Sequence, residues 1–175
     1  TITQDKNGVI WIGTTEGIFL INDLNKIFDN DFRVYRIKIP RNDGTGLADY
    51  LLGTEEIKAI AVDGANRKWI GTATSGLYLV SEDGLETIHH FTSENSPLLS
   101  NAIQSIAIND KTGEVFIGTG SGLISYQSDA IEGGDKFENV RAYPNPVRPE
   151  YTGIITITGL VADTRVTITD INGNL

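Results

Sequence analysis

Cysteine is absent from this chain of 175 residues, so disulfides, thiol nucleophiles and metal–thiolate sites are excluded. Methionine is absent too, and histidine occurs only twice. Basic residues are outnumbered, because 14 Lys and Arg stand against 23 Asp and Glu and give a formal net charge of −9. The sequence has no cluster of Lys and Arg that could bind along the phosphates of a nucleic acid, which disfavours nucleic-acid binding. No apolar run is long enough to span a membrane, so we expect no membrane segment in this chain.

Glycine, by contrast, is abundant, with 19 residues, and many of them belong to a pattern that occurs three times. The copies begin at Asp5, Asp63 and Asp110. In each copy an aromatic residue follows six positions later and the glycine of an Ile-Gly-Thr triplet follows eight positions later: Trp11 and Gly13, Trp69 and Gly71, Phe116 and Gly118. The aromatic residues are 58 and 47 positions apart. This spacing is typical of β-propeller blades with an insertion in the first interval.

The start of each copy predicts a tight turn. Asp is favoured at the first position of a type I turn, and the fourth residue often has a positive φ. Glycine adopts that conformation without strain, and Gly8 and Gly113 occupy the position in two copies. Asn66 replaces glycine in the middle copy and is the next most tolerant residue type. We therefore expect all three residues to have a positive φ.

Alternating apolar stretches surround these turns and predict antiparallel strands. They cover residues 9–12, 57–62, 77–80, 86–91 and 103–108. We expect an all-β fold in which residues 1–138 form about three four-stranded blades, the C-terminal blades of a β-propeller. The aromatic residue would pack between adjacent blades, and the glycine of Ile-Gly-Thr would let their backbones approach. Because propellers have four to eight blades, we expect the remaining blades of a longer protein as partners.

The character of the sequence changes after Asp129. Residues 132–136 read as a linker, and residues 140–149 hold three of the five prolines, which favours an extended run. Two alternating stretches, residues 153–160 and 165–170, predict strands, and Asn172-Gly173 predicts a hairpin turn. We expect residues 139–175 to be the start of a C-terminal immunoglobulin-like β-sandwich, truncated before it closes.

The triple pattern, with its closing Gly-(Leu/Ile), resembles the two-component regulator propeller repeat. The segment Leu99–Ile106 is similar to the lead-in of that repeat. The resemblance covers about residues 1–130 and implies a propeller of the kind found in periplasmic hybrid sensor kinases and in envelope proteins of Bacteroidetes-type bacteria. The tail, with Tyr143-Pro144-Asn145-Pro146-Val147, resembles the C-terminal domain of the propeller component of type IX (Por) secretion.

These resemblances imply a protein of the periplasm or cell surface that is not an enzyme. Its partner would be a protein, a glycan or a lipopolysaccharide-like ligand. The first hypothesis is a binding component of a type IX secretion and surface-attachment complex. The alternative is the glycan-sensing ectodomain of a hybrid two-component histidine kinase. The triple pattern itself supports either hypothesis equally, because a fold does not specify a function.

No motif in the sequence supports a catalytic, cofactor or metal site, and the ligand-binding residues are unknown. His89 and His90 are neighbours on a predicted strand, so they point to opposite faces and could not chelate one metal. Asp5, Asn7 and Glu16 do not fit a calcium loop, because Ile10 replaces its required glycine. Gly118–Gly122 lacks the lysine of a phosphate loop. The acidic pairs Glu55-Glu56 and Glu82-Asp83 read as solvated surface.

Two features remain as candidates for ligand contact. Loops carry function in propellers, so the loop Pro40–Gly46, within the insertion of the first interval, is the first candidate, although a tolerated surface insertion is the favoured explanation. The second candidate is a carbohydrate-binding aromatic surface, although the same residues on strands usually pack in a core. The aromatic residues are Tyr35, Tyr50, Tyr78, Phe91 and Tyr126.

Overall fold

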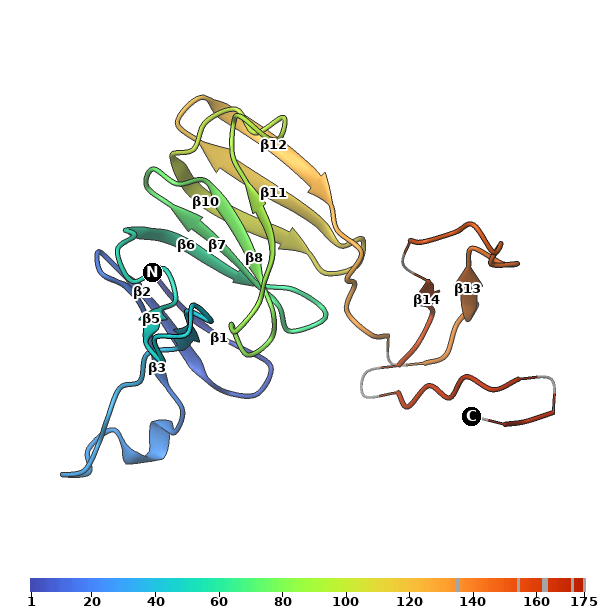
Figure 1. Ribbon diagram of the computed structural model, residues 1–175, viewed down its shortest axis with the longest axis horizontal. Coiled ribbons are helices and arrows are strands. Elements are labelled where there is room, and N and C mark those ends of the chain that lie inside the picture. The colour runs from blue at the N-terminus through green and yellow to red at the C-terminus, as the bar shows by residue number, and fades with distance from the viewer. Residues whose placement is uncertain (135, 154, 162–163, 171, 175) are drawn as a thin grey trace. The chain divides into compact units, whose positions relative to one another are not determined.

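The computed structural model describes residues 1–134, 136–153, 155–161, 164–170 and 172–174. The chain divides into two compact units, residues 1–131 and 132–175 (Figure 1). The described elements are β-strands and a single 3₁₀ turn, η1, at Leu24–Lys26, which confirms the all-β fold. Within the described ranges, no helix has the length and apolar character needed to cross a membrane.

Three antiparallel sheets in the first unit correspond to the three copies of the repeat. The first contains β1 (Ile2–Gln4), β2 (Ile10–Thr14) and β3 (Gly17–Ile21). The second contains β6 (Ile57–Val62), β7 (Lys68–Thr72), β8 (Leu77–Val80) and β9 (Thr87–Phe91). The third contains β10 (Ile103–Asn109), β11 (Glu114–Thr119) and β12 (Gly122–Gln127). Only the middle sheet has the expected four strands in the described residues.

The predicted turn conformations are confirmed. Gly8, Asn66 and Gly113 have φ angles of 84°, 60° and 72°. In the first copy the Asp5 carboxylate accepts hydrogen bonds from the backbone N–H groups of Asn7 and Val9. Asp63 does the same for Ala65 and Arg67. The aspartate therefore stabilises the turn by satisfying backbone donors that the strands leave unpaired.

The third turn differs from the prediction by one residue. Asn109, not Asp110, accepts the backbone N–H groups of Thr112 and Gly113 through its carbonyl, and its side chain accepts the N–H of Lys111. Ile108 pairs with Val115, whereas the corresponding pair in the first copy is Gln4 with Ile10. The third turn is thus one residue longer than the first. The residue that accepts the hydrogen bonds of the turn is therefore Asn109, one position before Asp110.

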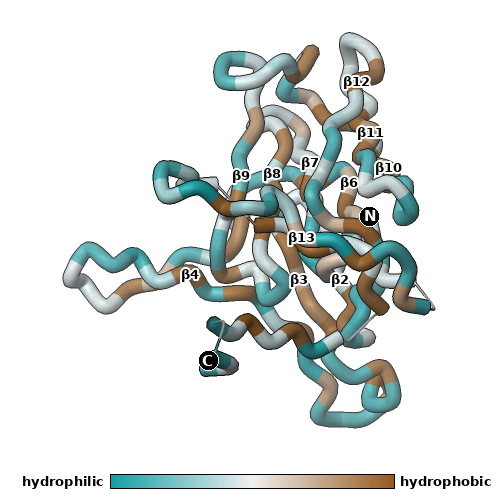
Figure 2. The backbone as a smooth tube through the Cα atoms, turned by 90° about the vertical axis from the view of Figure 1, so that its right-hand side faces the viewer, coloured by the Kyte–Doolittle hydropathy of each residue, from teal (hydrophilic) through white to brown (hydrophobic). Residues whose placement is uncertain are grey.

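Each tryptophan of the repeat packs between neighbouring sheets. Trp11 belongs to a core with Ile57 and Ile60 of the second sheet. Trp69 belongs to a core with Ile103, Val115 and Ile117 of the third sheet. The first strands of adjacent sheets, β1 with β6 and β6 with β10, also contact one another. Figure 2 shows hydrophobic residues in β2, β3 and β6 and hydrophilic residues at many of the turns. The sheets therefore pack face to face as propeller blades.

The glycine of Ile-Gly-Thr allows this close packing. A Cβ on Gly13 would lie 2.5 Å from Cγ2 of Ile57 on the next sheet. A Cβ on Gly71 would overlap the side chain of Ile103, again on the next sheet. Both distances are far below ordinary van der Waals contact, so only glycine fits at these two positions.

We expect Gly71→Ala to lower the free energy of unfolding by about 1–3 kcal/mol, because Ile103 must move to accept the new methyl group. Gly120→Ala is the matched control, since the nearest atom to its Cβ would be Nε2 of Gln104 at 3.9 Å. We expect the control to stay within about 0.5 kcal/mol of the wild type. Urea unfolding followed by tryptophan fluorescence measures both, and equal effects would contradict the proposed role of Gly71 in packing.

The insertion of the first interval forms an arm and a hairpin. The arm, residues 22–35, contains η1 and returns at Tyr35, whose backbone N–H and C=O bond to Leu20. The hairpin pairs β4 (Lys38–Pro40) with β5 (Ala48–Tyr50). Ile37 and Leu51 flank the hairpin and are buried in the first core, so the base of the insertion is fixed to the blades.

In the second unit, β13 (Arg141–Tyr143) pairs with β14 (Thr156–Thr158). Residues 140–149 were predicted to be extended, and Arg141–Tyr143 within them is a strand of this sheet. Residues 165–170 form no strand, although alternation predicted one, because no described strand pairs with them. The predicted segments also include Asp135, Ile154 and Ile171, which lie outside the described residues. The sandwich therefore stays a prediction.

The boundary between the two compact units lies at a different position in the sequence from the predicted domain boundary. The predicted domains were 1–138 and 139–175, whereas residues 132–138 belong to the second unit. Gly134 donates its backbone N–H to Leu160, and Glu138 donates its own to Gly159. These bonds join Gly134 and Glu138 to the two residues that follow β14. The domain limits themselves stay a prediction.

Candidate functional site

A cleft of about 370 Å³ lies between the first and second sheets. Two turns form its walls: the repeat turn of the first copy and the β8–β9 turn of the second. Its lining combines carboxylates, amides and apolar side chains: Asp5, Asn7, Val9, Trp11, Leu20, Asn22, Ser81, Glu82 and Asp83. Asn7 donates its side-chain amide to Glu82 over 2.7 Å and so joins the two walls.

Lys68 stands behind this cleft and is completely buried, with 0% of its surface exposed. Its ammonium group donates to the backbone carbonyls of Asn66 and Glu82 over 2.7 Å each. It also lies 3.0 Å from Oδ2 of Asp5 and 4.7 Å from the centroid of the Trp11 ring. Since Asp5 belongs to the first sheet and Lys68 to the second, a buried ion pair joins the two blades.

The pKa of Asp5 is lowered. Burial opposes the charged form, but hydrogen bonds from Lys68, Trp11 and the Val9 backbone, together with the Lys68 charge, outweigh it. The Trp11 indole donates its Nε1–H to Oδ2 of Asp5 over 3.0 Å. The charged carboxylate is therefore the form that the fold stabilises.

This shift predicts a dependence of stability on pH. A carboxyl whose folded pKa lies below its unfolded value of 3.8 stabilises the fold above pH 4 and loses that effect as the pH falls through the folded pKa. We expect the free energy of unfolding of the wild type to exceed that of Asp5→Asn by about 1–3 kcal/mol at pH 6, and the difference to shrink below pH 4. Urea titrations from pH 6 to pH 2 measure it, and a constant difference would contradict the prediction.

Arg67 forms a second connection, between the second sheet and the segment after the third. Its guanidinium lies 2.8 Å from Oδ2 of Asp63 and 2.8 Å from Oδ1 of Asp129, and it also bonds to the Ser128 hydroxyl. Burial of Asp129 opposes its charged form, but the hydrogen bond from Arg67 lowers its pKa. Asp63 thus pairs with a cation of its own sheet, whereas Asp5 pairs with a cation of the next.

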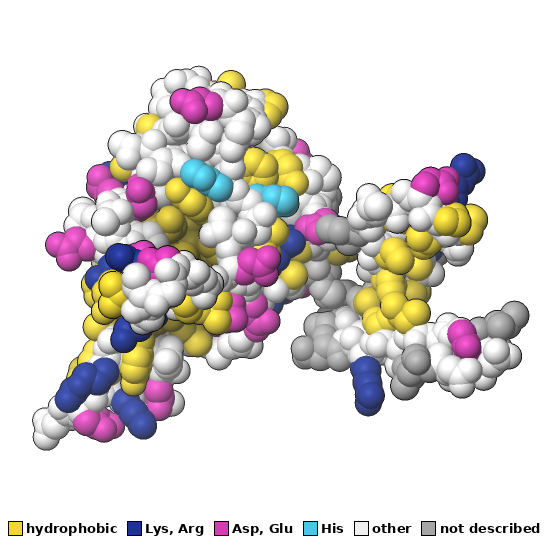
Figure 3. Space-filling model, in the orientation of Figure 1, with side chains coloured by type: hydrophobic (Ala, Val, Ile, Leu, Met, Phe, Trp, Pro, Cys, Tyr) yellow, Lys and Arg dark blue, Asp and Glu magenta, His cyan; other side chains and the backbone are white. Residues whose placement is uncertain are grey.

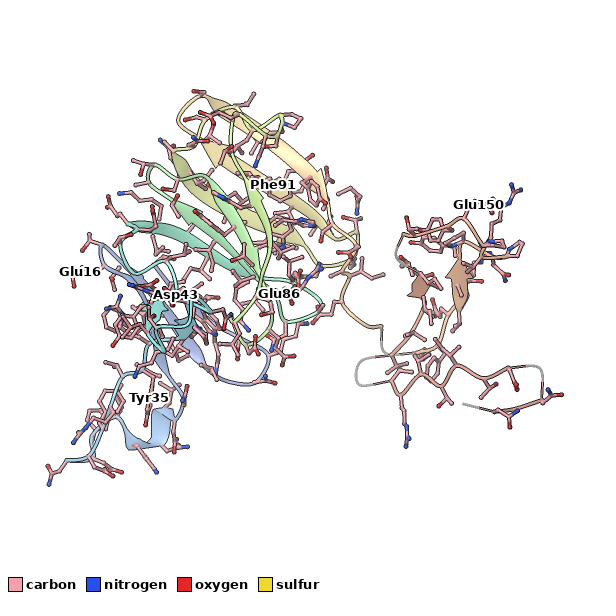
Figure 4. The ribbon with its side chains drawn as sticks, viewed as in Figure 1. Glu16, Tyr35, Asp43, Glu86, Phe91 and Glu150 are labelled. Carbon is pink, nitrogen blue, oxygen red and sulfur yellow. The ribbon has the colours of Figure 1, made fainter. Side chains whose placement is uncertain are left out.

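An apolar pocket of about 150 Å³ lies between the second and third sheets. Phe91 and Tyr126 line it, and their ring centroids are 5.2 Å apart. Trp69 lies against both, with its ring parallel to that of Phe91 at 6.1 Å. Of the five aromatic candidates, the structure brings these two together, on β9 and β12. Tyr35 lies on the arm (Figure 4) and Tyr50 on β5.

The two histidines lie at the surface, where Figure 3 shows them beside hydrophobic side chains. The His90 ring stacks on Tyr78 with centroids 3.9 Å apart, and its Nε2 lies 2.7 Å from the Ser75 carbonyl oxygen. His89 instead contacts Phe91. Adjacent residues of β9 thus have different neighbours, as the strand geometry predicts.

The loop Pro40–Gly46 lies at the tip of the β4–β5 hairpin, as a loop was predicted there. Arg41 forms two hydrogen bonds with the Asp49 carboxylate across the hairpin. These bonds lower the pKa of Asp49, although such an exposed pair adds little stability. None of the described pockets includes this loop. Its role in ligand binding stays a prediction.

The remaining candidates have structural contacts of their own. Glu16 accepts a bond from Arg36 through its backbone carbonyl, and both Asp5 oxygens are occupied. Gly118 lies in β11 and Gly122 in β12, and residues 120–121 form the turn between these strands. Glu56 pairs with Lys58 at the surface, and Asp83 caps its own turn by accepting bonds from Ser81 and Leu85. In the parts of the chain that are described, no three His, Asp or Glu residues gather as a metal site would require.

Sequence reasoning missed Lys68 and Arg67. The other copies have Ile10 and Val115 at the position of Lys68. A lysine at a position that is apolar in the other copies was the signal that could have identified this residue. A charged residue at a core position is almost never fully buried unless paired. Finding its partner required the packing of two blades, which the repeat alone does not specify.

The family model of the two-component regulator propeller matches residues 1–16. No curated protein matches the chain. Among solved structures, PorZ of Porphyromonas gingivalis, an essential bacterial surface component of its type IX secretion system, is 38% identical over 99% of the chain, with a TM-score of 0.70. The extracellular domain of BT3049 from Bacteroides thetaiotaomicron, assigned to a hybrid two-component system, is 26% identical over 81%, with a TM-score of 0.55. A domain of BT4673 from the same organism, at 20% identity and a TM-score of 0.53, shares the fold.

The chain spans 23% of the PorZ chain and 18% of the BT3049 domain. The match to PorZ therefore concerns a part of that protein that corresponds to both units of this chain. The three repeats, the family match at the first of them and the blade packing all agree. The chain thus carries a match to the two-component regulator propeller repeat at its first copy and shares the propeller-type fold of PorZ.

Proposed function

We propose that the chain is the non-catalytic, binding part of a cell-envelope protein that acts in type IX secretion and surface attachment. The observation that carries this proposal is the 38% identity to PorZ over 99% of the chain. That coverage includes the second unit, whereas the match to the BT3049 domain covers 81%. The secretion component therefore accounts for more of the chain than the sensor domain does.

The geometry is compatible with binding rather than catalysis. The carboxylates of the cleft accept hydrogen bonds from neighbouring side chains or turns, which suits a structural role better than proton transfer. Glu82, for example, accepts bonds from Asn7 and Asn66, and these bonds lower its pKa. The partner would be a protein, or a glycan or lipopolysaccharide-like ligand bound in the cleft between the first two blades.

The second candidate function is a periplasmic glycan-sensing ectodomain of a hybrid two-component histidine kinase. The 26% identity to the BT3049 extracellular domain favours it. Both functions use the same blades, and they differ in the event that binding triggers. That event is assembly of a secretion complex in one case and phosphotransfer on the far side of a membrane in the other.

Deletion of the gene in its own organism distinguishes the two. The secretion function predicts that cargo proteins of the type IX system stay in the periplasm and are absent from the cell surface, and that the wild-type gene restores them. A gene carrying Lys58→Ala, which removes only an exposed ion pair, should restore secretion equally well. Normal surface delivery of cargo in the deletion strain, with a lost transcriptional response to glycans, would establish the sensor instead.

A further inference from the structure

The indole of Trp69 is completely buried, yet its Nε1–H has no hydrogen-bond partner among the described residues. The equivalent indole of the first copy, Trp11, donates to Oδ2 of Asp5. Both tryptophans lie six residues after the aspartate of their copy and pair with the residue two positions before it. A buried donor without an acceptor is rare and costs free energy, so the difference between the two copies needs a physical reason.

Arg67 provides that reason, because it bonds to the equivalent acceptor atom in the second copy. Its Nε lies 2.8 Å from Oδ2 of Asp63, whereas the first copy has the apolar Val9 at this position. The rest of the turn is the same, since each aspartate accepts two backbone N–H groups through Oδ1 and donates its own to the fourth residue after it. The second copy therefore has a bond from an arginine where the first has one from the indole.

Arg67 extends this contact to the end of the first unit. Its Nη2 donates to the Ser128 hydroxyl over 3.0 Å and to Oδ1 of Asp129 over 2.8 Å. The Asp63 side chain is fully buried, whereas 51% of the Asp129 side chain is exposed. The inner bond is therefore shielded from water, and the outer ion pair is open to dissolved ions.

The third repeat turn contacts the same segment. Ser128 donates its backbone N–H to the Gly113 carbonyl over 3.1 Å. A Cβ on Gly113 would lie 2.7 Å from the carbonyl oxygen of Ala130, so the two backbones pass very close to each other. Residues 128–130 thus lie against the third turn through their backbone, and Arg67 supplies their contact with the second blade.

We propose that Arg67 is a strap with a closed and an open state. In the closed state it bridges Asp63 and Asp129 and fixes residues 128–130 to the second blade. In the open state it leaves both carboxylates, Asp63 accepts the indole N–H of Trp69, and residues 128–130 are released. The first copy shows that the turn accommodates the indole bond. Because that bond offsets part of the loss, the end of the unit opens without unfolding of the blades.

Nuclear magnetic resonance of the indole N–H groups in the whole gene product tests the open state. The variant Arg67→Val has the residue type of the first copy and keeps the strap open. We expect the Trp69 indole proton to move downfield in this variant, because a bond to a carboxylate deshields it, and the Trp69→Phe variant assigns the signal. Arg41→Val is the matched control, since it removes an arginine that is bonded only to the exposed Asp49. It should leave the signal in place.

Amide hydrogen exchange at Ser128 tests the release of the segment. We expect this amide to exchange at least about tenfold faster in Arg67→Val and in Asp129→Ala than in the wild type, which is the scale of one hydrogen bond to a charged group. Asp129→Ala keeps the bond between Arg67 and Asp63, so the Trp69 signal should not move in it. About 1 M NaCl should also speed the exchange in the wild type but not in Asp129→Ala, because salt screens the exposed ion pair.

Two results would overturn the proposal. A Trp69 signal that does not move in Arg67→Val means that Asp63 does not accept the indole when the arginine is absent. A Ser128 amide that keeps its wild-type rate in Asp129→Ala and at high salt means that the strap does not hold the segment, and this second test stands even if Arg67→Val does not fold. Neither measurement involves secretion, so the strap and the proposed function succeed or fail separately.

Discussion

Replacing Lys68 by alanine is expected to lower the free energy of unfolding by about 3–5 kcal/mol, because it leaves a buried carboxylate without its cation. Asp5 has only 8% of its surface exposed, so its carboxylate would be left largely desolvated without its cation. The backbone carbonyls of Asn66 and Glu82 lose a donor as well. Urea unfolding at pH 7, followed by tryptophan fluorescence, measures the loss.

Two control variants separate the ion pair from simple loss of volume. Lys58→Ala removes the exposed pair with Glu56 and should change stability by less than about 1 kcal/mol. The double variant Asp5→Asn with Lys68→Met removes both charges but keeps an acceptor in the turn, so it should lose less than Lys68→Ala alone. A loss below about 1 kcal/mol for Lys68→Ala would mean that the pair does not stabilise the contact between blades.

Replacing Trp69 by alanine should be comparably damaging, at about 3–5 kcal/mol. Its side chain is completely buried between the second and third sheets, and it contacts the rings of Phe91 and Tyr126. Removal of the indole leaves a cavity between the two sheets that the surrounding side chains fill only in part. Thermal and urea unfolding should both show the loss.

Phenylalanine variants of the two tryptophans give a sharper comparison. The Nε1–H of Trp69 has no hydrogen-bond partner among the described residues, whereas that of Trp11 donates to Asp5. Trp69→Phe therefore removes volume only, while Trp11→Phe also removes a bond to a buried charge. We expect Trp11→Phe to cost about 1.5–3 kcal/mol more. Equal losses would contradict the role assigned to the Trp11–Asp5 bond.

The repeat could be interpreted from the sequence to a considerable depth. Its period predicted the blades, its Asp-x-x-Gly spacing predicted positive φ at Gly8, Asn66 and Gly113, and its aromatic residues predicted packing between sheets. Local conformational preferences and side-chain volume determine these features, and both are properties of residue types. The error at Asp110 arose because a turn can gain one residue without changing the motif.

The candidate site was much less predictable. The sequence pointed to the loop Pro40–Gly46, whose role in ligand binding stays a prediction. It did not point to the cleft and the apolar pocket, which lie at the contacts between blades. Asn7 and Glu82 are 75 positions apart along the chain and meet only because two turns of neighbouring blades converge. Such a meeting depends on the register of one sheet against the next, which no local pattern encodes.

The sequence by itself determined the all-β class, the number of repeat copies, the turn conformations and the tryptophans of the core. These follow from the local preferences of Gly, Asn and Asp and from apolar periodicity. Only the tertiary structure decided which cation neutralises which aspartate and where the cleft lies. Those features depend on long-range distances, and the free energy of a buried charge is set by the groups that folding brings beside it.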